Sequence, residues 1–225
     1  MAEHRTRQDR TRRDREALAD YRRKRDFART REPRGADREA AGDAPVFVVQ
    51  IHDASAMHFD FRLEVDGVLK SWAVPKGPSD DPGTKRLAMP TEDHPMEYQD
   101  YEGVIAAGEY GGGTVIVWDR GTYRNLSRDR RSGKEIPFAQ ALERGHVSFR
   151  LDGSKLHGGY ALTRIPPRDG RGEPWLLVKE ADGRAEHHGT PVPRRARSVL
   201  TGRTLRQVAH DERESPGSQD GGGSA

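Results

Sequence analysis

The chain has 225 residues, of which 32% are hydrophobic and 33% are charged, and it contains no cysteine. This composition excludes a disulfide scaffold, a thiolate nucleophile and a cysteine-ligated zinc site, so any metal must be held by His, Asp or Glu. The N-terminus is charged and no apolar run approaches roughly 18 residues, which predicts a soluble cytoplasmic protein without a signal peptide or a membrane span.

Positive charge is concentrated at the N-terminal end of the chain. Residues 1–38 contain fourteen Lys and Arg against eight Asp and Glu, a local charge of +6, although the whole chain carries only +3. We expect a short helix at 15–30, with Asp14 as its N-cap and Pro33 as its stop, and then a linker at 34–44. A basic arm of this kind is either a solvated tail or a surface that neutralises nucleic-acid phosphates, and composition alone favours neither.

Most apolar residues lie between Val46 and Lys179, where their pattern predicts short strands. Asp66-Gly67 is a type I′ turn signal between two alternating segments, so a hairpin is the firmest expected element. The glycines at 111–113 predict a tight turn or bulge and not a phosphate cradle, because no P-loop lysine follows them. Asp119-Arg120-Gly121 predicts another turn. The expected strands are 46–51, 58–65, 68–74, a short strand before Glu92, 114–118, 146–151, 159–164 and 175–179, with a helix at Pro137–Arg144.

About eight short strands with one or two helices favour a mainly β protein, a small closed or nearly closed β-barrel with one or two flanking helices. We divide the chain into a basic arm with a short helix and linker at 1–44, a barrel domain at 45–180, and an extension at 181–225. The extension is rich in Arg, Gly and Pro, and we expect it to be flexible.

The segment from His58 to Val65 alternates polar and apolar residues without a fault. As a strand it places His58, Asp60, Arg62 and Glu64 on one face, with His52 on the segment before it. Two imidazoles and a carboxylate can hold a divalent metal, and a neighbouring guanidinium can bind an anion. The alternative is an ordinary polar sheet face with chance histidines.

These residues belong to a longer set of motifs. The set comprises Gln50-x-His52, His58-Phe59-Asp60-Phe61-Arg62-Leu63-Glu64, Lys70-Ser71-Trp72-Ala73-Val74-Pro75-Lys76-Gly77-Pro78-Ser79, Lys85-Arg86-Leu87-Ala88, Glu92-Asp93-His94-Pro95, Tyr98, the upstream segment from Tyr21 to Pro33, and Gly108-Glu109-Tyr110-Gly111. Over about the first four fifths of the chain they closely resemble the 3′-phosphoesterase domain of bacterial DNA ligase D. Ala106-Ala107 departs from the family, which more usually has Pro-Glu there. No ligase or polymerase motif follows, so we expect a free-standing phosphoesterase.

The resemblance implies a Mn²⁺-dependent hydrolase of DNA 3′ ends, although other divalent metals fit the same ligands. Such an enzyme removes a 3′-terminal ribonucleoside as a phosphodiesterase and a 3′-phosphate as a phosphomonoesterase, and leaves a 3′-hydroxyl for repair by non-homologous end joining. The expected partners are DNA or DNA/RNA primer 3′ ends and an end-joining ligase, a polymerase or end-binding proteins. The protein is then expected to be a monomer at the bacterial nucleoid.

The resemblance also assigns roles to individual residues. It makes His52, His58 and Asp60 the metal ligands, with His58 counted among the catalytic residues. His94 would contact the phosphate and protonate the leaving oxygen, or serve as a fourth ligand, with Tyr98 hydrogen-bonded nearby. The side chains expected to bind the phosphate are Arg62, Lys76, Arg86 and Arg25. Gln50 and Glu92 are expected to orient the imidazoles. Asp26 and Glu32, together with Arg25, are expected to hold the N-terminal arm across the groove.

Each assignment has a structural alternative. Arg86 can be a surface charge, Tyr98 a packed aromatic residue and Glu92 a solvated carboxylate. At the level of function, His58-x-Asp60 with His94 also fits the two-His-one-carboxylate triad of Fe(II) oxygenases, but the crowded cations favour phosphate chemistry. A third possibility is a non-catalytic DNA-end-binding accessory module for repair.

Overall fold

The computed structural model describes residues 16–35, 44–167, 170, 172–183, 185 and 192–214. The expected N-cap Asp14, most of the expected linker and the C-terminal segment 215–225 lie outside the described residues. The elements are α2 (Ala19–Arg23), β1 (Val46–Asp53), β2 (Met57–Val65), β3 (Val68–Val74), β4 (Lys85–Pro90), η1 (Met96–Asp100), β5 (Gly103–Ile105), β6 (Gly113–Asn125), α3 (Phe138–Glu143), β7 (His146–Gly153), β8 (His157–Arg164), β9 (Trp175–Lys179), η2 (Pro193–Arg195) and α4 (Leu205–Glu214).

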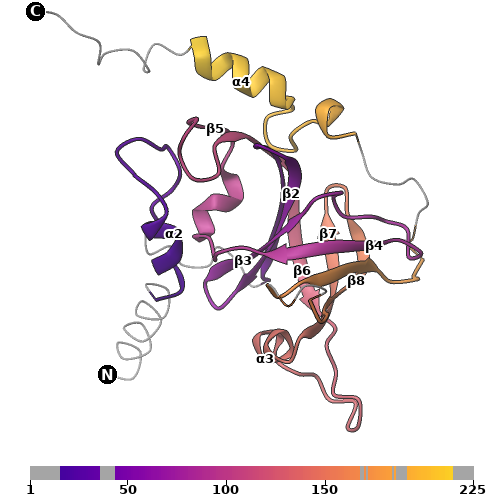
Figure 1. Ribbon diagram of the computed structural model, residues 1–225. Coiled ribbons are helices and arrows are strands. Elements are labelled where there is room, and N and C mark those ends of the chain that lie inside the picture. The colour runs from indigo at the N-terminus through magenta and orange to yellow at the C-terminus, as the bar shows by residue number, and fades with distance from the viewer. Residues whose placement is uncertain are drawn as a thin grey trace, which may run out of the picture.

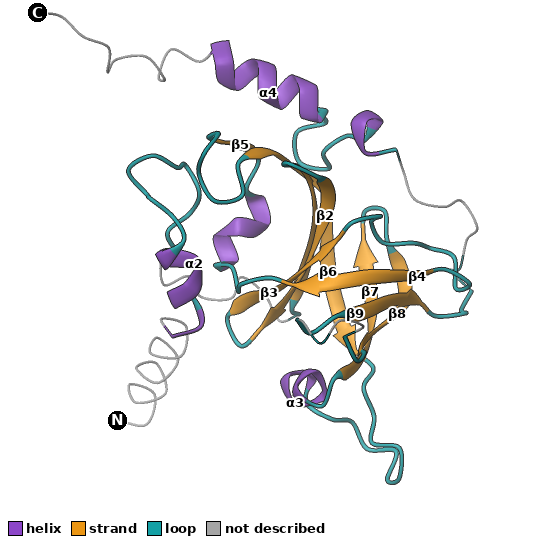
Figure 2. Cartoon of the chain, in the orientation of Figure 1, coloured by secondary structure: helices purple, strands orange, loops and turns teal. Residues whose placement is uncertain are grey.

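The strands form a closed antiparallel barrel, as the sequence predicts. The order is β1-β2-β3-β4-β9-β8-β7-β6, and pairing between β6 and β1 closes the ring, while β5 is an extra strand beside the start of β6. Figure 1 shows the helices outside this ring, with α3 at one end and α4 on the far side. Figure 2 shows the same separation of strands from helices. None of the described helices is long and apolar enough to cross a membrane.

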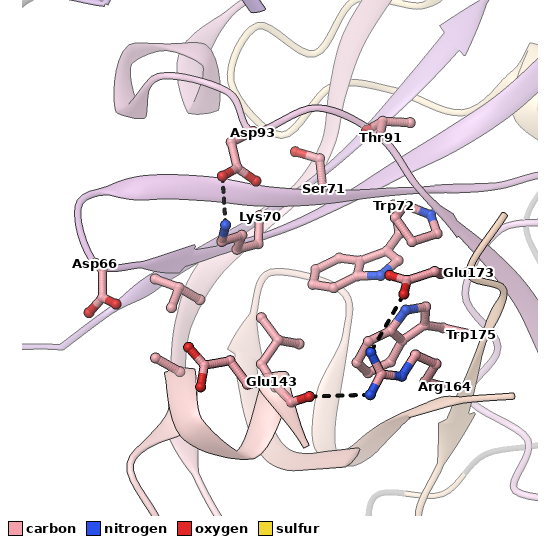
Figure 3. A pocket seen from close by; sticks show the side chains of 14 residues that line it. Asp66, Lys70, Ser71, Trp72, Thr91, Asp93, Glu143, Arg164, Glu173 and Trp175 are labelled. Carbon is pink, nitrogen blue, oxygen red and sulfur yellow. Dashed lines mark hydrogen bonds and ion pairs between the residues drawn. The ribbon is translucent and has the colours of Figure 1, made fainter. Parts of the chain in front are cut away.

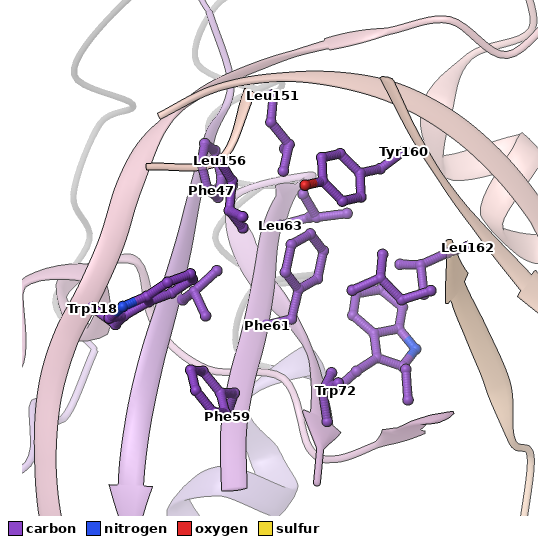
Figure 4. Close-up of a cluster of buried hydrophobic side chains, with 14 of the residues drawn as sticks. Phe47, Phe59, Phe61, Leu63, Trp72, Trp118, Leu151, Leu156, Tyr160 and Leu162 are labelled. Atoms are coloured by element: carbon purple, nitrogen blue, oxygen red, sulfur yellow. The ribbon is translucent and has the colours of Figure 1, made fainter. Parts of the chain in front are cut away.

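The β2–β3 hairpin sets the register that the site depends on. Asp66 and Gly67 both have positive φ, 50° and 84°, as a type I′ turn requires. Counting outward from the turn, Arg62 pairs with Ser71 and Asp60 pairs with Ala73. Alternate residues of the same strands point into the barrel. This inner core contains Phe47, Phe59, Phe61, Leu63, Trp72, Trp118, Leu151, Tyr160 and Leu162 (Figure 4).

A second apolar layer covers part of the outer face of the barrel. The N-terminal arm contributes Leu18 and Tyr21 to it, and η1 contributes Met96 and Tyr98. These side chains pack over the outward residues of β1 and β6, among them Val48 and Val117. Burying each large apolar side chain stabilises the folded state by roughly 1.5–3 kcal/mol. The arm is therefore docked by packing, and it lies beside His94 of the candidate site described below.

Two predicted elements differ from the structure. The expected helix at 15–30 is shorter, because α2 ends at Arg23 and residues 26–29 form a turn capped by the Asp26 carboxylate. The expected turn at 119–121 is wrong, because β6 continues through it with a bulge opposite Val49 and Gln50. The Asp119 carboxylate accepts backbone N–H bonds from residues 154–156 instead of capping its own turn. A Cβ on Gly121 would lie 2.1 Å from the Asp152 carbonyl oxygen, so this glycine permits a close approach of backbones.

The C-terminal extension contains an element that the sequence analysis missed. Within residues 192–214, α4 lies against β5 and β6 and buries Leu205 and Val208. The backbone N–H of Val199 also donates to the carbonyl of Val117. This part of the extension is packed on the barrel, in contrast to the expected flexibility. The leucine and valine stand three residues apart on a helix face, a signal that the surrounding Arg and Gly residues obscured.

A candidate metal centre on the outer face of the barrel

His52, His58 and Asp60 meet on the outer face of the barrel, as their alternation predicts. His52 pairs directly with His58 across β1 and β2, and Asp60 pairs with Gln50. One nitrogen of each imidazole and one carboxylate oxygen all lie within 4.8 Å of one another. His52 Nδ1 and His58 Nε2 are each 3.7 Å from an oxygen of Asp60. Two nitrogens and an oxygen at this spacing form a group that could hold a divalent metal.

The hydrogen bonds of the two imidazoles fix which nitrogen is available. His52 Nε2 lies 2.8 Å from the carbonyl oxygen of Gly111, and His58 Nδ1 lies 2.8 Å from that of Ala56. A carbonyl only accepts, so these nitrogens carry the protons and leave lone pairs on His52 Nδ1 and His58 Nε2. Both lone-pair nitrogens are the ones that face Asp60. Backbone carbonyls orient ligand histidines in this way in metalloproteins, so the residues fit a metal.

Asp60 is buried but remains ionised. Burial alone would raise the pKa of its carboxyl, but Arg62 and the two imidazoles outweigh burial and hold the pKa well below its usual range. Arg62 Nη2 lies 3.1 Å from Asp60 Oδ2. The carboxylate is therefore ionised at neutral pH, as a metal ligand must be.

Arg62, which the resemblance assigns to the phosphate, is bonded to three residues of the protein. Its side chain is only 3% exposed, its Nε donates to Gln50 Oε1 at 2.8 Å, and its Nη1 donates to Ser71 Oγ at 2.8 Å. Gln50, Ser71 and Asp60 together contact all three nitrogens of the guanidinium. Arg62 is therefore placed to position Asp60, and the side-chain oxygen of Gln50 accepts from Arg62. The amide of Gln50 is anchored in turn by the carbonyls of Tyr98 and Tyr101.

His94 lies on the other side of Arg62, outside the three-ligand group. Its Nδ1 is 2.8 Å from the carbonyl of Glu92, which makes Nδ1 the protonated nitrogen. Its Nε2 faces Arg25 Nη2 at 3.4 Å. Burial, assisted by the charges of Arg62 and Arg25, lowers the pKa of His94 well below its ordinary value. The ring is therefore neutral, and its free lone pair points toward a cation.

The N-terminal arm reaches His94 through a buried ionic network. Arg25 Nε donates to Glu32 Oε1 at 2.8 Å, and its Nη1 donates to Glu92 Oε1 at 3.0 Å. Tyr98 donates its hydroxyl to Glu32 at 2.9 Å, and the Arg25 guanidinium stacks on Tyr21. Asp26 does not join this network, because it is exposed and caps its own turn. The arm thus docks beside His94, with three carboxylate contacts that are almost fully buried.

The structure places Lys76 at the end of the barrel that carries His58, without a contact to the network, and turns Arg86 away from it. Lys76 is exposed in the loop after β3, at the end of the barrel where β2 begins. Arg86 shares the inner face of β4 with buried Ala88, whereas Asp60 faces outward. Of the expected phosphate cations, only Arg62 and Arg25 lie within the network around Asp60 and His94.

Sequence reasoning missed two residues of the site. Ser71 Oγ accepts a hydrogen bond from Arg62 Nη1 and lies 3.3 Å from His94 Nδ1. Counting from the Asp66-Gly67 turn places Ser71 opposite Arg62, so the hairpin register could have identified it. Gly111 binds His52 through its carbonyl, and its φ of 74° belongs to the turn before β6. No side-chain signal marks such a carbonyl.

A pocket of about 370 Å³ lies behind the site, between β3, the segment 90–93 and α3 (Figure 3). Trp72 and Trp175 meet edge to face at its wall, and Arg164 contacts Glu173 and the Glu143 carbonyl. Its charged lining residues are Lys70, Arg164, Asp66, Asp93, Glu143 and Glu173. Carboxylates outnumber cations there, so the pocket disfavours a phosphate. The cations of the candidate site, Arg25 and Arg62, lie elsewhere, in the network around Asp60 and His94.

The fold and the site together define a β-barrel protein with a His-His-Asp group that could hold a metal. The family model of the DNA Ligase D 3′-phosphoesterase domain matches residues 50–164, and the chain belongs to this family.

Three curated relatives support the assignment. The multifunctional non-homologous end joining protein LigD of Pseudomonas aeruginosa is 51% identical over 191 residues, which cover 84% of this chain and 22% of the relative. LigD of Mycobacterium tuberculosis is 45% identical over 159 residues, and LigD of Mycolicibacterium smegmatis is 38% identical over 165 residues. These cover 71% and 73% of this chain and 19% and 21% of the relatives, so the chain spans about a fifth of their length.

Proposed function

We propose that the chain is a metal-dependent hydrolase that trims DNA 3′ ends for end joining, with Mn²⁺ as its metal. The single observation that carries the proposal is the His52–His58–Asp60 group, in which both imidazole lone pairs face a carboxylate that stays ionised. The family assignment supplies the substrate class. Arg62 stands beside Asp60 and Arg25 stands beside His94, and positive charge here would favour an anionic substrate, whereas an Fe(II) oxygenase has no need of it.

When bound, the metal would polarise a phosphate oxygen and supply an activated water. His52, His58 and Asp60 would hold it, and Arg62 would keep the Asp60 carboxylate ionised and oriented. Burial and the neighbouring cations now depress the pKa of neutral His94. A phosphate would raise that pKa by offsetting the charges of Arg62 and Arg25, so that His94 would take up a proton at Nε2. The protonated ring could then donate to the leaving oxygen. Tyr98 and Glu32 would act by holding Arg25 beside this ring.

We further propose both activities for this one centre: removal of a 3′-terminal ribonucleoside as a phosphodiesterase and removal of a 3′-phosphate as a phosphomonoesterase. The first reaction replaces the P–O5′ bond of the departing ribonucleoside by a bond from phosphorus to water oxygen and leaves a 3′-phosphate, and the second breaks the P–O3′ bond of that phosphate in the same way. Both transfer phosphorus to water and protonate a leaving oxygen, so the same metal and the same His94 could serve both. Lys76, exposed at the end of the barrel, would contribute general attraction for DNA. The product would be a 3′-hydroxyl for a ligase or polymerase at the bacterial nucleoid.

The test is an assay of the purified chain with Mn²⁺ on primers that end in a ribonucleotide or in a 3′-phosphate. We expect both ends to become 3′-hydroxyls, and we expect chelation of the metal to stop the reaction. DNA binding without any turnover at either end would overturn the proposal and indicate a non-catalytic end-binding module. The variant His58→Ala provides the matched inactive control.

A further inference from the structure

Six exposed cations gather around the end of β6 and the loop that follows it. They are Arg124, Arg128, Arg130, Arg131, Lys134 and Arg144, referred to below as the basic cluster. Among the residues that the structure describes, none of the six forms an ion pair. The arm is different, since Lys24, Arg29 and Arg31 each pair with a carboxylate. The basic cluster therefore presents positive charge to which no carboxylate of the described chain is bonded.

The loop at 126–136 holds this charge in a defined shape. The backbones of Arg128 and Glu135 bridge across it, and Asp129 exchanges backbone hydrogen bonds with Gly133 and Lys134 at 2.8 Å. The Asp129 carboxylate is used inside the loop, where it accepts from the backbone N–H groups of Arg131 and Ser132. Figure 1 shows the loop projecting from the barrel beside α3. A projecting loop with internal bonds can enter a groove or follow a backbone without first becoming ordered.

The face of β6 that leads to this loop is also the face of the metal centre. Val48 lies on the same side of β1 as His52, and Arg120 pairs with Val48. Beyond the bulge, Arg120, Thr122 and Arg124 therefore alternate on the outer face. Arg120 pairs with Asp100, and Arg124 is the first member of the basic cluster.

The length of strand between the two sites is close to one repeat of DNA. His52 pairs with Val115, and β6 ends at Asn125, ten residues further along the strand. At a rise of about 3.3 Å per residue this path measures about 33 Å along the strand. One helical turn of B-DNA is about 34 Å long. A duplex whose 3′ end lies at the metal centre can thus present phosphates to the basic cluster about one turn away.

We propose that the basic cluster binds the phosphate backbone of duplex DNA about one helical turn from the 3′ end held at the metal centre. The identity of the ligand rests on the proposed function, but the surface and its charge do not. Arginine on an exposed loop suits this role, because its guanidinium can bind two phosphate oxygens at once. The contact would hold the substrate without reading its sequence.

The test compares two variants that remove the same charge. One replaces Arg128, Arg130, Arg131 and Lys134 with Gln, and the control replaces Arg194, Arg195, Arg206 and Arg213 with Gln on the C-terminal extension, where these four residues are also exposed. Binding is measured by fluorescence anisotropy without metal, on DNA hairpins that have one free 3′ end and a stem of 6 or 20 base pairs. Each titration is repeated across a range of salt concentrations.

We expect the loop variant to bind the 20-base-pair stem more weakly than wild type, with a salt slope reduced by about one for each phosphate that the variant no longer neutralises. On the 6-base-pair stem, which ends before one turn, it should bind as wild type does, and the control should match wild type on both stems. Equal weakening on both stems, equal weakening in both variants, or unchanged binding would each overturn the proposal. Because the readout is binding, wild-type protein that binds but fails to turn over DNA ends would refute the proposed function and leave this proposal standing.

Discussion

Arg62 and Asp60 face the same side of β2, and Arg62 Nη2 lies 3.1 Å from Asp60 Oδ2. A carboxylate this deeply buried would tend to take up a proton, and the neighbouring guanidinium is the main influence that prevents it. Gln50 and Ser71 occupy the other nitrogens of Arg62 and fix its plane. We therefore expect the affinity of the group for a cation to depend on a buried arginine that is bonded to one of the three candidate ligands.

The first prediction concerns Arg62→Lys. Lysine keeps the charge but cannot bond Asp60, Gln50 and Ser71 together, because it lacks the planar fork. We expect the affinity for Mn²⁺, measured by isothermal titration calorimetry, to fall by roughly 10- to 100-fold, the usual cost of losing a group that orients a ligand. Arg150→Lys is the control, since Arg150 is more exposed and lies 3.9 Å from Asp182. Affinity equal to wild type would show that Arg62 contributes only general positive potential.

The second prediction concerns removal of a candidate ligand. His58→Ala deletes one of the two lone pairs that face Asp60, and outside the centre it breaks only the bond to the Ala56 carbonyl. We expect loss of detectable Mn²⁺ binding and of both phosphoesterase activities, with a far-ultraviolet circular dichroism spectrum like that of wild type. Asp60→Ala and His52→Ala should have the same effect on metal binding. His146→Ala, an exposed histidine on β7, is the control. Full activity in any of the three ligand variants would remove that residue from the metal site.

The sequence predicts those parts of the site that depend on strand alternation. Turn chemistry at Asp66-Gly67 fixes the hairpin, and period-two alternation then places His58, Asp60 and Arg62 on one face. The residue types alone do not predict which groups Arg62 contacts. An arginine beside a metal site can bind a phosphate of the substrate, or it can hydrogen-bond to residues of the protein and hold a ligand in place. The bulge in β6 was missed for a similar reason. Asp119-Arg120-Gly121 has turn chemistry, but the Asp119 carboxylate is used by the turn between β7 and β8.

The third prediction concerns the docked arm and uses Glu32→Gln. Glutamine can still accept from the Tyr98 hydroxyl, but it removes the charge that pairs with Arg25 in a nearly fully buried site. Breaking a buried pair typically costs about 3–5 kcal/mol, because the remaining charge is left without compensation. Glu92 still contacts Arg25, so we expect the lower end of that range.

The measurements are the free energy of unfolding in urea and hydrogen exchange at residues 19–32. We expect faster exchange across this segment and lower turnover at saturating DNA, since Arg25 would no longer be held beside His94. Glu212→Gln breaks the exposed pair between Arg31 and Glu212, and it should change stability by less than about 1 kcal/mol. If Glu32→Gln keeps wild-type exchange and turnover, apolar packing alone docks the arm.

The fourth prediction concerns the pH dependence of stability and rests on His94. Burial and the charges of Arg62 and Arg25 place the pKa of His94 in the folded state well below 6.5. An unfolded chain takes up this proton near pH 6.5, so below that pH the unfolded state binds more protons than the folded state. Titration of His94 therefore does not lower the free energy of unfolding above pH 6.5. As the pH falls from 6.5 toward the pKa of His94 in the folded state, the free energy of unfolding decreases by up to about 1.4 kcal/mol per pH unit. His94→Phe removes the titrating group, so the free energy of unfolding in metal-free buffer should decline less steeply between pH 6.5 and 5 than it does in wild type.

Tyr21→Phe alters a neighbouring ring without removing a group that titrates in this range, and it should keep the wild-type slope. Equal slopes in His94→Phe and wild type would show that another group is responsible for the sensitivity to acid.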